Sequence, residues 1–430
     1  MFLNMMQDWA GWLLILFSFS IVLMWKHVRS DTKVVRAIWF CTVLHHAVAY
    51  LNVHNPAESS FLSVYIPDAS AFHGDGASLA INDTEWKLRK GGVISGSTLY
   101  IQFLGFFYRA IGPSHLFGKE LSVLAFVLSC VVLVKLVDLL ALRRFRVGIV
   151  LLFGLLPSTV IFMSVTLRES WQALFFLLSV YWAMRLYKQP GILNVSFLLI
   201  SAICLALTHH SLTWFAICLI VISVYWGIFV RKKNVHWARH LRFLFAGLLV
   251  VCVIISSQKM GVFVPLGQAL EDAAGIHKAL SAYDARTAYS FVLNTSSVYG
   301  LVTTIPMLFV QYMFSPFPWQ VENVKDVYAL LESMLRFMLL LFALSSWRRS
   351  SGEVRSYYGF LLIAVLGMEL MWALGTANWG TAMRHHVPGF SVIVLLGAPR
   401  LILFMRELQF GIFGRRNDSG ELNEQSLHMS

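Results

Sequence analysis

Residues 120–141 read ELSVLAFVLSCVVLVKLVDLLA, and a basic cluster, RRFR at residues 143–146, follows them. A helix of about 22 residues crosses the ~30 Å hydrocarbon layer of a bilayer, whereas a β-barrel strand would alternate in polarity and be about half as long. Lys135 and Asp138 fall on one face of such a helix and are expected to neutralise each other. This stretch therefore predicts a transmembrane helix.

Apolar runs of the same kind, each about 17–22 residues long, recur along the whole chain. Of its 430 residues, 58% are hydrophobic and only 13% are charged, and the mean hydropathy is +0.68. These values lie far outside the usual range of soluble domains. The predicted fold class is all-α: a polytopic helical membrane bundle with about 11–12 spans or re-entrant segments.

The distribution of positive charge sets the orientation of the predicted bundle. The net charge of +12 comes from Lys and Arg in short clusters between apolar runs, as the positive-inside rule expects for cytoplasmic loops. Residues 142–146, 231–242 and 406–430 should therefore face the cytoplasm, and residues 52–119 and 376–387 the periplasm, in a bacterial inner membrane. The clustering argues against nucleic-acid binding. The five cysteines lack paired spacing and indicate neither a disulfide framework nor a zinc site.

One transmembrane bundle, residues 1–416, is the simplest domain organisation. Residues 52–119 and 258–324 are expected to form periplasmic or interfacial regions, and the polar residues 417–430 a disordered cytoplasmic tail. No internal repeat is clear enough to suggest the symmetry of a transporter.

Two apolar segments in the outer regions differ from ordinary spans. Residues 99–111 are rich in aromatic side chains but are interrupted by polar ones, a pattern typical of a helix that lies in the membrane interface. Residues 298–314 are expected to re-enter the membrane without crossing it, because Pro306 and the segment Ser315-Pro316-Phe317-Pro318-Trp319 would break a regular helix.

The stretch Pro67-Asp68-Ala69-Ser70-Ala71-Phe72-His73-Gly74-Asp75-Gly76 is the candidate catalytic region. Its proline and glycines predict a turn-rich loop that could close on a ligand. Asp68 is the candidate general base for a sugar hydroxyl, and Asp75 and His73 are further catalytic candidates. Whether there is a cofactor is open; a divalent cation would be held by Asp68 and Asp75. Solvated, turn-forming aspartates are the alternative of equal weight.

Lone arginines at the outer ends of predicted spans are candidates for binding phosphate. Arg168 and Arg384 have no basic cluster beside them, and the planar fork of a guanidinium group matches a phosphate or pyrophosphate. The alternative for each is an anchor in the membrane interface. Arg286 and His385 are assigned to the same phosphate-binding group.

Supporting roles behind these groups are expected for Glu169, Glu369 and His210. Glu169 could simply pair with the neighbouring Arg168, whereas Glu369 lies inside a predicted span without a local charged partner and is a functional candidate for that reason. Adjacent histidines occur in three pairs, but neighbouring side chains on a helix point about 100° apart and cannot easily bind one metal ion.

Four stretches together carry a family resemblance. They are Pro67-Asp68-Ala69; Pro157-Ser158 followed by Leu167-Arg168-Glu169-Ser170; Ser315-Pro316-Phe317-Pro318-Trp319; and Gly380-Thr381-Ala382-Met383-Arg384-His385-His386-Val387-Pro388. The chain resembles, over most of its length, the bacterial polytopic membrane proteins of exopolysaccharide and O-antigen clusters. These are related in layout to glycosyltransferases of the C-type fold and to polysaccharide polymerases. One extra N-terminal span departs from the C-type plan.

The resemblance implies a membrane glycosyltransferase. Its donor would be a sugar or oligosaccharide on polyprenyl phosphate or pyrophosphate, and it would transfer or polymerise sugar units onto a saccharide acceptor at the periplasmic face. The catalytic Asp of the first outer loop in the C-type fold maps onto Asp68. One alternative is an O-antigen-type repeat-unit polymerase that uses outer-face arginines instead of a catalytic Asp. Others are a lipid or polysaccharide transporter, or a non-catalytic subunit that binds other polysaccharide-synthesis proteins.

Overall fold

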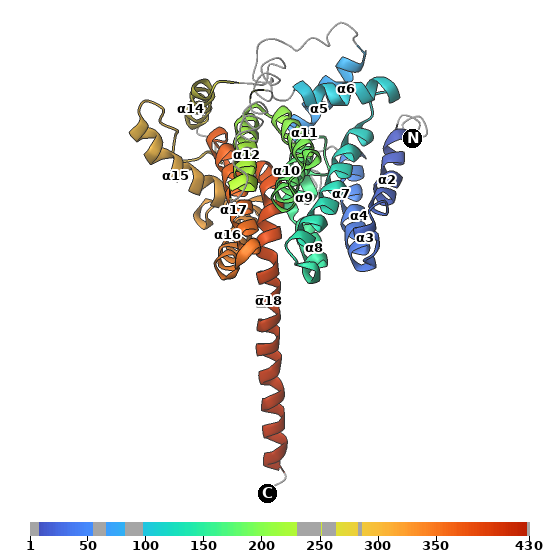
Figure 1. The fold of residues 1–430 in the computed structure, drawn as a ribbon, viewed down its shortest axis with the longest axis vertical. Coiled ribbons are helices and arrows are strands. Elements are labelled where there is room, and N and C mark those ends of the chain that lie inside the picture. Colours follow the sequence, from blue (N-terminus) through green and yellow to red (C-terminus); the bar gives the residue numbers. More distant parts are fainter. Residues whose placement is uncertain are drawn as a thin grey trace.

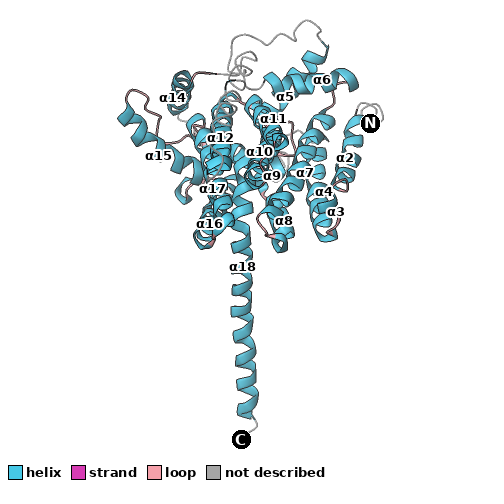
Figure 2. Ribbon diagram, in the orientation of Figure 1, coloured by secondary structure: helices cyan, strands magenta, loops and turns pink. Residues whose placement is uncertain are grey.

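The computed structural model describes residues 8–54, 66–81, 98–229, 251, 264–282 and 286–427. Helices make up nearly all of this part of the chain (Figure 2), and the β-pairing within it is limited to an isolated bridge between Ala288 and Asn378. Five helices are long and apolar enough to cross a membrane. They are α4 (Thr32–His54), α7 (His115–Leu139), α16 (Val324–Arg349), α17 (Gly352–Gly375) and α18 (Trp379–Leu427). The predicted helical membrane bundle is confirmed at this level.

Shorter helices complete the bundle. They are α2 (Trp9–Val22), α3 (Lys26–Arg29), α8 (Arg146–Leu155), α9 (Pro157–Phe162), α10 (Glu169–Lys188), α11 (Ile192–Thr208), α12 (His210–Phe229), α14 (Leu266–Ala282) and α15 (Val298–Phe314). The boundary between α8 and α9 lies before Pro157, because a proline disfavours the helical conformation of the residue before it; Leu156 has φ −57° and ψ 130°. Residues 231–242, which were expected in the cytoplasm, lie outside the described residues.

The two ends of the bundle differ in the way that the charge clusters predict. Figure 1 shows α14 and the helix pair α5 (Pro67–Ile81) and α6 (Thr98–Ile111) at one end, and α3, the α7–α8 connection and the C terminus toward the other. The basic cluster at residues 143–146 and the basic residues of α3 therefore share the end that lies away from α5. One orientation in a membrane satisfies all of them.

At the α7–α8 connection, one predicted charge pair is wrong. Asp138 accepts hydrogen bonds from Arg146, with Nε–Oδ1 and Nη2–Oδ2 distances of 2.8 and 2.5 Å. The Nζ of Lys135 lies instead 5.9 Å from the ring centroid of Trp25 and 5.6 Å from that of Tyr181. The turn after α7 brings a guanidinium fork to Asp138, and such a fork matches a carboxylate better than an ammonium group does.

The helix α15 ends against α16. Its C-terminal end reaches the middle of α16: the carbonyl of Met313 accepts a 2.7 Å hydrogen bond from Nη1 of Arg336, and the ring of Phe314 lies 5.4 Å from that of Phe337. Arg336 is twelve residues into α16, so this contact lies about 18 Å along the helix from its start. Residues 315–323 return the chain to that start. The helix ends at Phe314 and, contrary to expectation, continues through Pro306.

The loop predicted for residues 67–76 is wrong, because the stretch belongs to α5. Pro67 suits the first helical position, where an N–H donor is not needed, and Asp68 in the first turn is favourable beside the positive end of the helix dipole. The predicted helix at residues 99–111 is present as α6. A Cβ at Gly76 would lie 3.0 Å from Cβ of Leu104 in α6, so this glycine serves the close crossing of two helices rather than a turn.

The C-terminal tail also differs from its prediction. Residues 417–427 continue α18 as a helix, where the polar composition predicted disorder. Extending an existing helix does not require a new nucleus, which is the costly step of helix formation. The bundle end of α18, in contrast, packs against α10, α16 and α17 and supplies much of the core.

Candidate functional site

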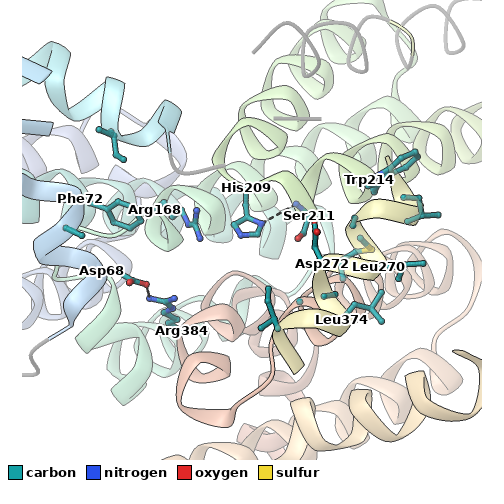
Figure 3. Close-up of a pocket in the computed structure, with 18 of the residues that line it drawn as sticks. Asp68, Phe72, Arg168, His209, Ser211, Trp214, Leu270, Asp272, Leu374 and Arg384 are labelled. Carbon is teal, nitrogen blue, oxygen red and sulfur yellow. Dashed lines mark hydrogen bonds and ion pairs between the residues drawn. The ribbon is translucent and has the colours of Figure 1, made fainter. Parts of the chain in front are cut away.

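A cavity of about 370 Å³ lies at the end of the bundle that α5 covers (Figure 3). Its polar lining comes from Asp68, Asp75, Arg168, His209, Ser211, Asp272 and Arg384. Its apolar lining includes Phe72, Ile101, Trp214, Leu270, Ile276, Met371 and Leu374. The fold thus brings four predicted site residues, the two aspartates of α5 and the two lone arginines, to one cavity from three distant parts of the chain.

The ion pair between Arg384 and Asp68 forms one wall of the cavity. Nη1 of Arg384 donates a hydrogen bond to Oδ2 of Asp68 (Figure 3). The Asp68 side chain is 48% exposed and that of Arg384 only 17%, so the carboxylate is accessible from the cavity while its partner is held in the protein. The pair therefore joins an accessible acceptor group to a fixed cation.

Glu169 lies behind the cavity among basic side chains. Its Oε1 is 3.7 Å from Nε of Arg384, 4.0 Å from Nε of Arg168 and 3.9 Å from Nε2 of His385, and its side chain is only 1% exposed. A buried carboxylate at this place holds two guanidinium groups toward one point and offsets their repulsion. Glu169 lies near both arginines and not only Arg168; its supporting role stays a prediction.

Asp68 and Asp75 lie on one face of α5, because residues seven apart return to the same side of a helix. Phe72 lies between them on that face and also lines the cavity. The two aspartates are separated by about 10 Å along the helix axis, which is too far for both to bind one cation directly. Among the described residues, no group of three or more His, Cys, Asp or Glu is placed to hold a metal ion.

His73 does not join the cavity of Asp68. It points from the opposite face of α5 into a second cavity, where its Nδ1 lies 2.8 Å from the hydroxyl of Tyr108 and its ring stacks on His115 at 3.6 Å. Burial, together with the positive charges of His115 and Lys119, lowers the pKa of His73 to about 4. The prediction that His73 shares a catalytic group with Asp68 and Asp75 fails because five residues on a helix turn the side chain to another face.

Two predicted phosphate ligands lie away from the cavity. His385 is buried against Trp372, with ring centroids 4.0 Å apart, and its Nδ1 is 2.8 Å from Oγ1 of Thr376. Arg286 forms two hydrogen bonds with Asp326, of 2.7 and 3.2 Å. Neither His385 nor Arg286 lines the cavity; Nε2 of His385 lies 3.9 Å from Oε1 of Glu169, behind the cavity.

Of the remaining predicted supporting residues, Glu369 does not line the cavity. Glu369 is fully buried, and its Oε2 lies 2.7 Å from Nδ1 of His386. Its neighbours include Arg336 rather than the arginines of the cavity. His210 begins α12, but its side chain lies outside the described part of the structure.

The half of the cavity that lies away from Asp68 and Arg384 was not predicted from the sequence. Asp272 and Leu270 come from α14 and Trp214 from α12 (Figure 3). The polar, alanine-rich composition around residues 268–297 marked an outer region, but it did not show which face of α14 meets the bundle. The hydrogen bond from Nε1 of Trp214 to the carbonyl of Val264, 3.0 Å long, ties the start of α14 to α12.

The cavity therefore combines two arginine side chains, an accessible carboxylate paired with one of them, and an apolar half formed by α12, α14 and α17. Such a set of groups can bind an anion next to a base, with space for an apolar substituent. Comparisons of the chain with protein-family models, with curated proteins and with solved structures found no match.

Proposed function

We propose that the chain transfers or polymerises sugar units from a donor linked to polyprenyl phosphate or pyrophosphate, at the periplasmic face of the bacterial inner membrane. The observation that carries this proposal is the meeting of Arg168, Arg384 and Asp68 at one cavity, at the end of the bundle away from the basic clusters. Guanidinium groups bind phosphate, and a carboxylate beside them can act as a base.

In the proposed reaction, an acceptor hydroxyl attacks the anomeric carbon of the donor sugar. The new carbon–oxygen bond forms while the bond between that carbon and the phosphate oxygen breaks, and the phosphate leaves with the bonding electrons. Asp68 takes the hydroxyl proton. Arg168 and Arg384 stabilise the negative charge that develops on the leaving phosphate, and the ion pair between Arg384 and Asp68 places the base next to it.

The apolar half of the cavity suits the lipid part of such a donor. Figure 3 shows Trp214, Leu270 and Leu374 on the side of the cavity away from Asp68 and Arg384. A polyprenyl phosphate has the same order of parts, a charged head joined to a hydrocarbon chain. The donor would lie with its phosphate at the arginines and its first isoprene units against α12 and α14.

The arginine-dependent polymerase is the second candidate, and the ion pair itself favours it. If Asp68 only holds Arg384 in position, the arginines would carry the reaction and the carboxylate would be replaceable by another hydrogen-bond acceptor.

Transport has less support, because the charged residues inside the bundle, such as Arg336 and Glu369, line neither of the two described cavities. A non-catalytic subunit would show no sugar transfer when purified in lipid nanodiscs with a lipid-linked saccharide.

Arg384→Lys is expected to raise the KM for the lipid-linked donor by about 10-fold to 100-fold, because a charge-assisted bond of the guanidinium fork is lost although the charge remains. Initial rates measured against donor concentration in nanodiscs test this. Arg286→Lys is the matched control: Arg286 lies outside the cavity and, like Arg384, is hydrogen-bonded to a carboxylate, and the KM of this variant should not change. Full activity of both Arg384→Lys and Arg384→Ala would show that Arg384 does not bind the donor phosphate and is an anchor in the membrane interface.

The proposed periplasmic orientation predicts the labelling of a cysteine placed at Ser70. This residue is exposed on α5, so Ser70→Cys should react with a membrane-impermeant maleimide once the outer membrane is permeable, while the inner membrane is intact. A cysteine at Arg355, at the start of α17 beyond the α16–α17 turn, should react only after the inner membrane is opened. The reverse order of labelling would overturn the orientation and the periplasmic site with it.

A further inference from the structure

The helix α5 separates two cavities. Asp68, Phe72 and Asp75 face the first cavity, whereas Ser70 and His73 face a second one of about 150 Å³. Each set follows the spacing of one helix face, three, four or seven residues apart. The carboxylate of Asp68 thus stands on a single helix whose other side lines a separate polar cavity.

The second cavity is lined by donors of hydrogen bonds and by bases. His73, His115 and Lys119 contribute the nitrogen atoms, and Ser70 and Thr166 contribute hydroxyl groups. The described residues that line it include no Asp or Glu. Of the three ammonium donors of Lys119, one bonds the carbonyl of Asn52 at 2.8 Å. The ammonium group of Lys119 and the lack of carboxylates among these residues disfavour a cation and suit an anion.

One acidic neighbour of this group, Asp8, is already engaged with another side chain. Asp8 interacts electrostatically with His115 and Lys119, but its carboxylate already accepts a 2.5 Å hydrogen bond from Oγ of Ser114 and does not line the cavity. An anion that enters would therefore meet the ammonium group of Lys119 directly. It would also favour protonation of one of the two stacked imidazole rings, whose centroids lie 3.6 Å apart.

We infer that the second cavity binds a phosphate or pyrophosphate group, namely that of a second lipid-linked substrate. The assignment of this ligand to an acceptor rests on the proposed function. Polymerisation of lipid-linked repeat units needs two such lipids, a donor that loses its phosphate and an acceptor that keeps it. With the donor phosphate at Arg168 and Arg384 and the acceptor phosphate at Lys119, Asp68 lies on the helix between them and can take the proton of the attacking hydroxyl.

Titration with inorganic pyrophosphate tests for the two sites. Purified full-length protein in a phosphate-free detergent should bind two equivalents by calorimetry. Lys119→Gln should weaken one of the two binding events by about 10-fold to 100-fold and leave the other unchanged, whereas Arg384→Lys should weaken only the other. Lys119→Arg should restore binding. Lys135→Gln, the same change further along α7 and beside Trp25 and Tyr181, is the control and should retain both events.

A second variant protects the test against misfolding. If the Lys119→Gln protein unfolds through loss of its bond to Asn52, His73→Gln keeps an amide that can bond Tyr108 and should weaken the same binding event. One equivalent of pyrophosphate in the wild-type protein, or two that neither variant affects, would overturn the second site.

The source of the phosphate is tested by competition in nanodiscs. Polyprenyl phosphate should displace the pyrophosphate that depends on Lys119, and phosphatidylglycerol at the same density should not. Displacement by inorganic phosphate but not by polyprenyl phosphate would overturn the acceptor assignment. Two sites without any sugar transfer would instead contradict the proposed function alone, and sugar transfer with a single pyrophosphate site would contradict only this inference.

Discussion

Asp68→Asn is expected to lower the turnover of sugar transfer by about 10²-fold to 10⁴-fold, the range that a general base typically contributes. A sugar hydroxyl is a very weak acid and needs a base as it attacks, and asparagine has no basic carboxylate oxygen. The amide oxygen can still accept the hydrogen bond of Arg384. The variant should therefore fold and bind the donor with a KM close to that of the wild type, while kcat falls.

Asp75→Asn is the matched control for this experiment. Asp75 lies on the same face of α5 and lines the same cavity, but no ion pair joins it to the arginines. Its replacement should lower kcat much less. Single-turnover assays with a radiolabelled lipid-linked saccharide measure both variants. Wild-type turnover in purified Asp68→Asn would remove the base-catalysed mechanism and leave the arginine-dependent polymerase as the better candidate.

The helical bundle could be predicted because its signal is local. A run of apolar residues as long as 120–141 has few alternatives to a membrane helix, and the charge that follows it indicates its orientation. The re-entry of residues 298–314 stays a prediction. The structure shows that this segment ends against the middle of α16, where Arg336 bonds the carbonyl of Met313.

The site could be predicted only as a set of candidates. Asp68 and Arg384 are 316 residues apart in the chain, and nothing in the sequence around either residue indicates that the two pair. The glycines of residues 67–76 indicated a turn, whereas tertiary contact with α6 makes them part of a helix crossing. That error also placed His73 in the wrong cavity, because side chains in a loop can converge and those on a helix follow its period.

A buried group of charged side chains could not be predicted from the sequence for the same reason. Arg336, Glu332 and Glu369 are at most 3% exposed, and the two carboxylates interact electrostatically with the arginine. Glu332 and Arg336 are four residues apart on α16, and Oε1 of Glu332 also accepts a 2.7 Å hydrogen bond from the backbone of Ser158. Glu369 fits against α18 at Gly389, where a Cβ would lie 1.8 Å from its Oε1.

The charges of this group balance when one proton is counted. Arg336 carries one positive charge and the two glutamates two negative ones, and a proton held between Oε2 of Glu369 and Nδ1 of His386, 2.7 Å apart, makes the sum zero. A buried group with a net charge would be costly. Arg336 is therefore the residue on which the neutrality of the group depends.

Arg336→Met is accordingly expected to destabilise the protein by about 3–5 kcal/mol, since it leaves a buried carboxylate without a cation. Glu369→Gln keeps the shape of its side chain and leaves Arg336 balanced by Glu332, so its cost should be that of a single hydrogen bond, about 1 kcal/mol. Unfolding in mixed micelles with increasing SDS measures both variants under one condition. Equal losses would show that packing around these side chains, and not their charge, determines stability, whereas a much larger loss for Arg336→Met supports the charge balance.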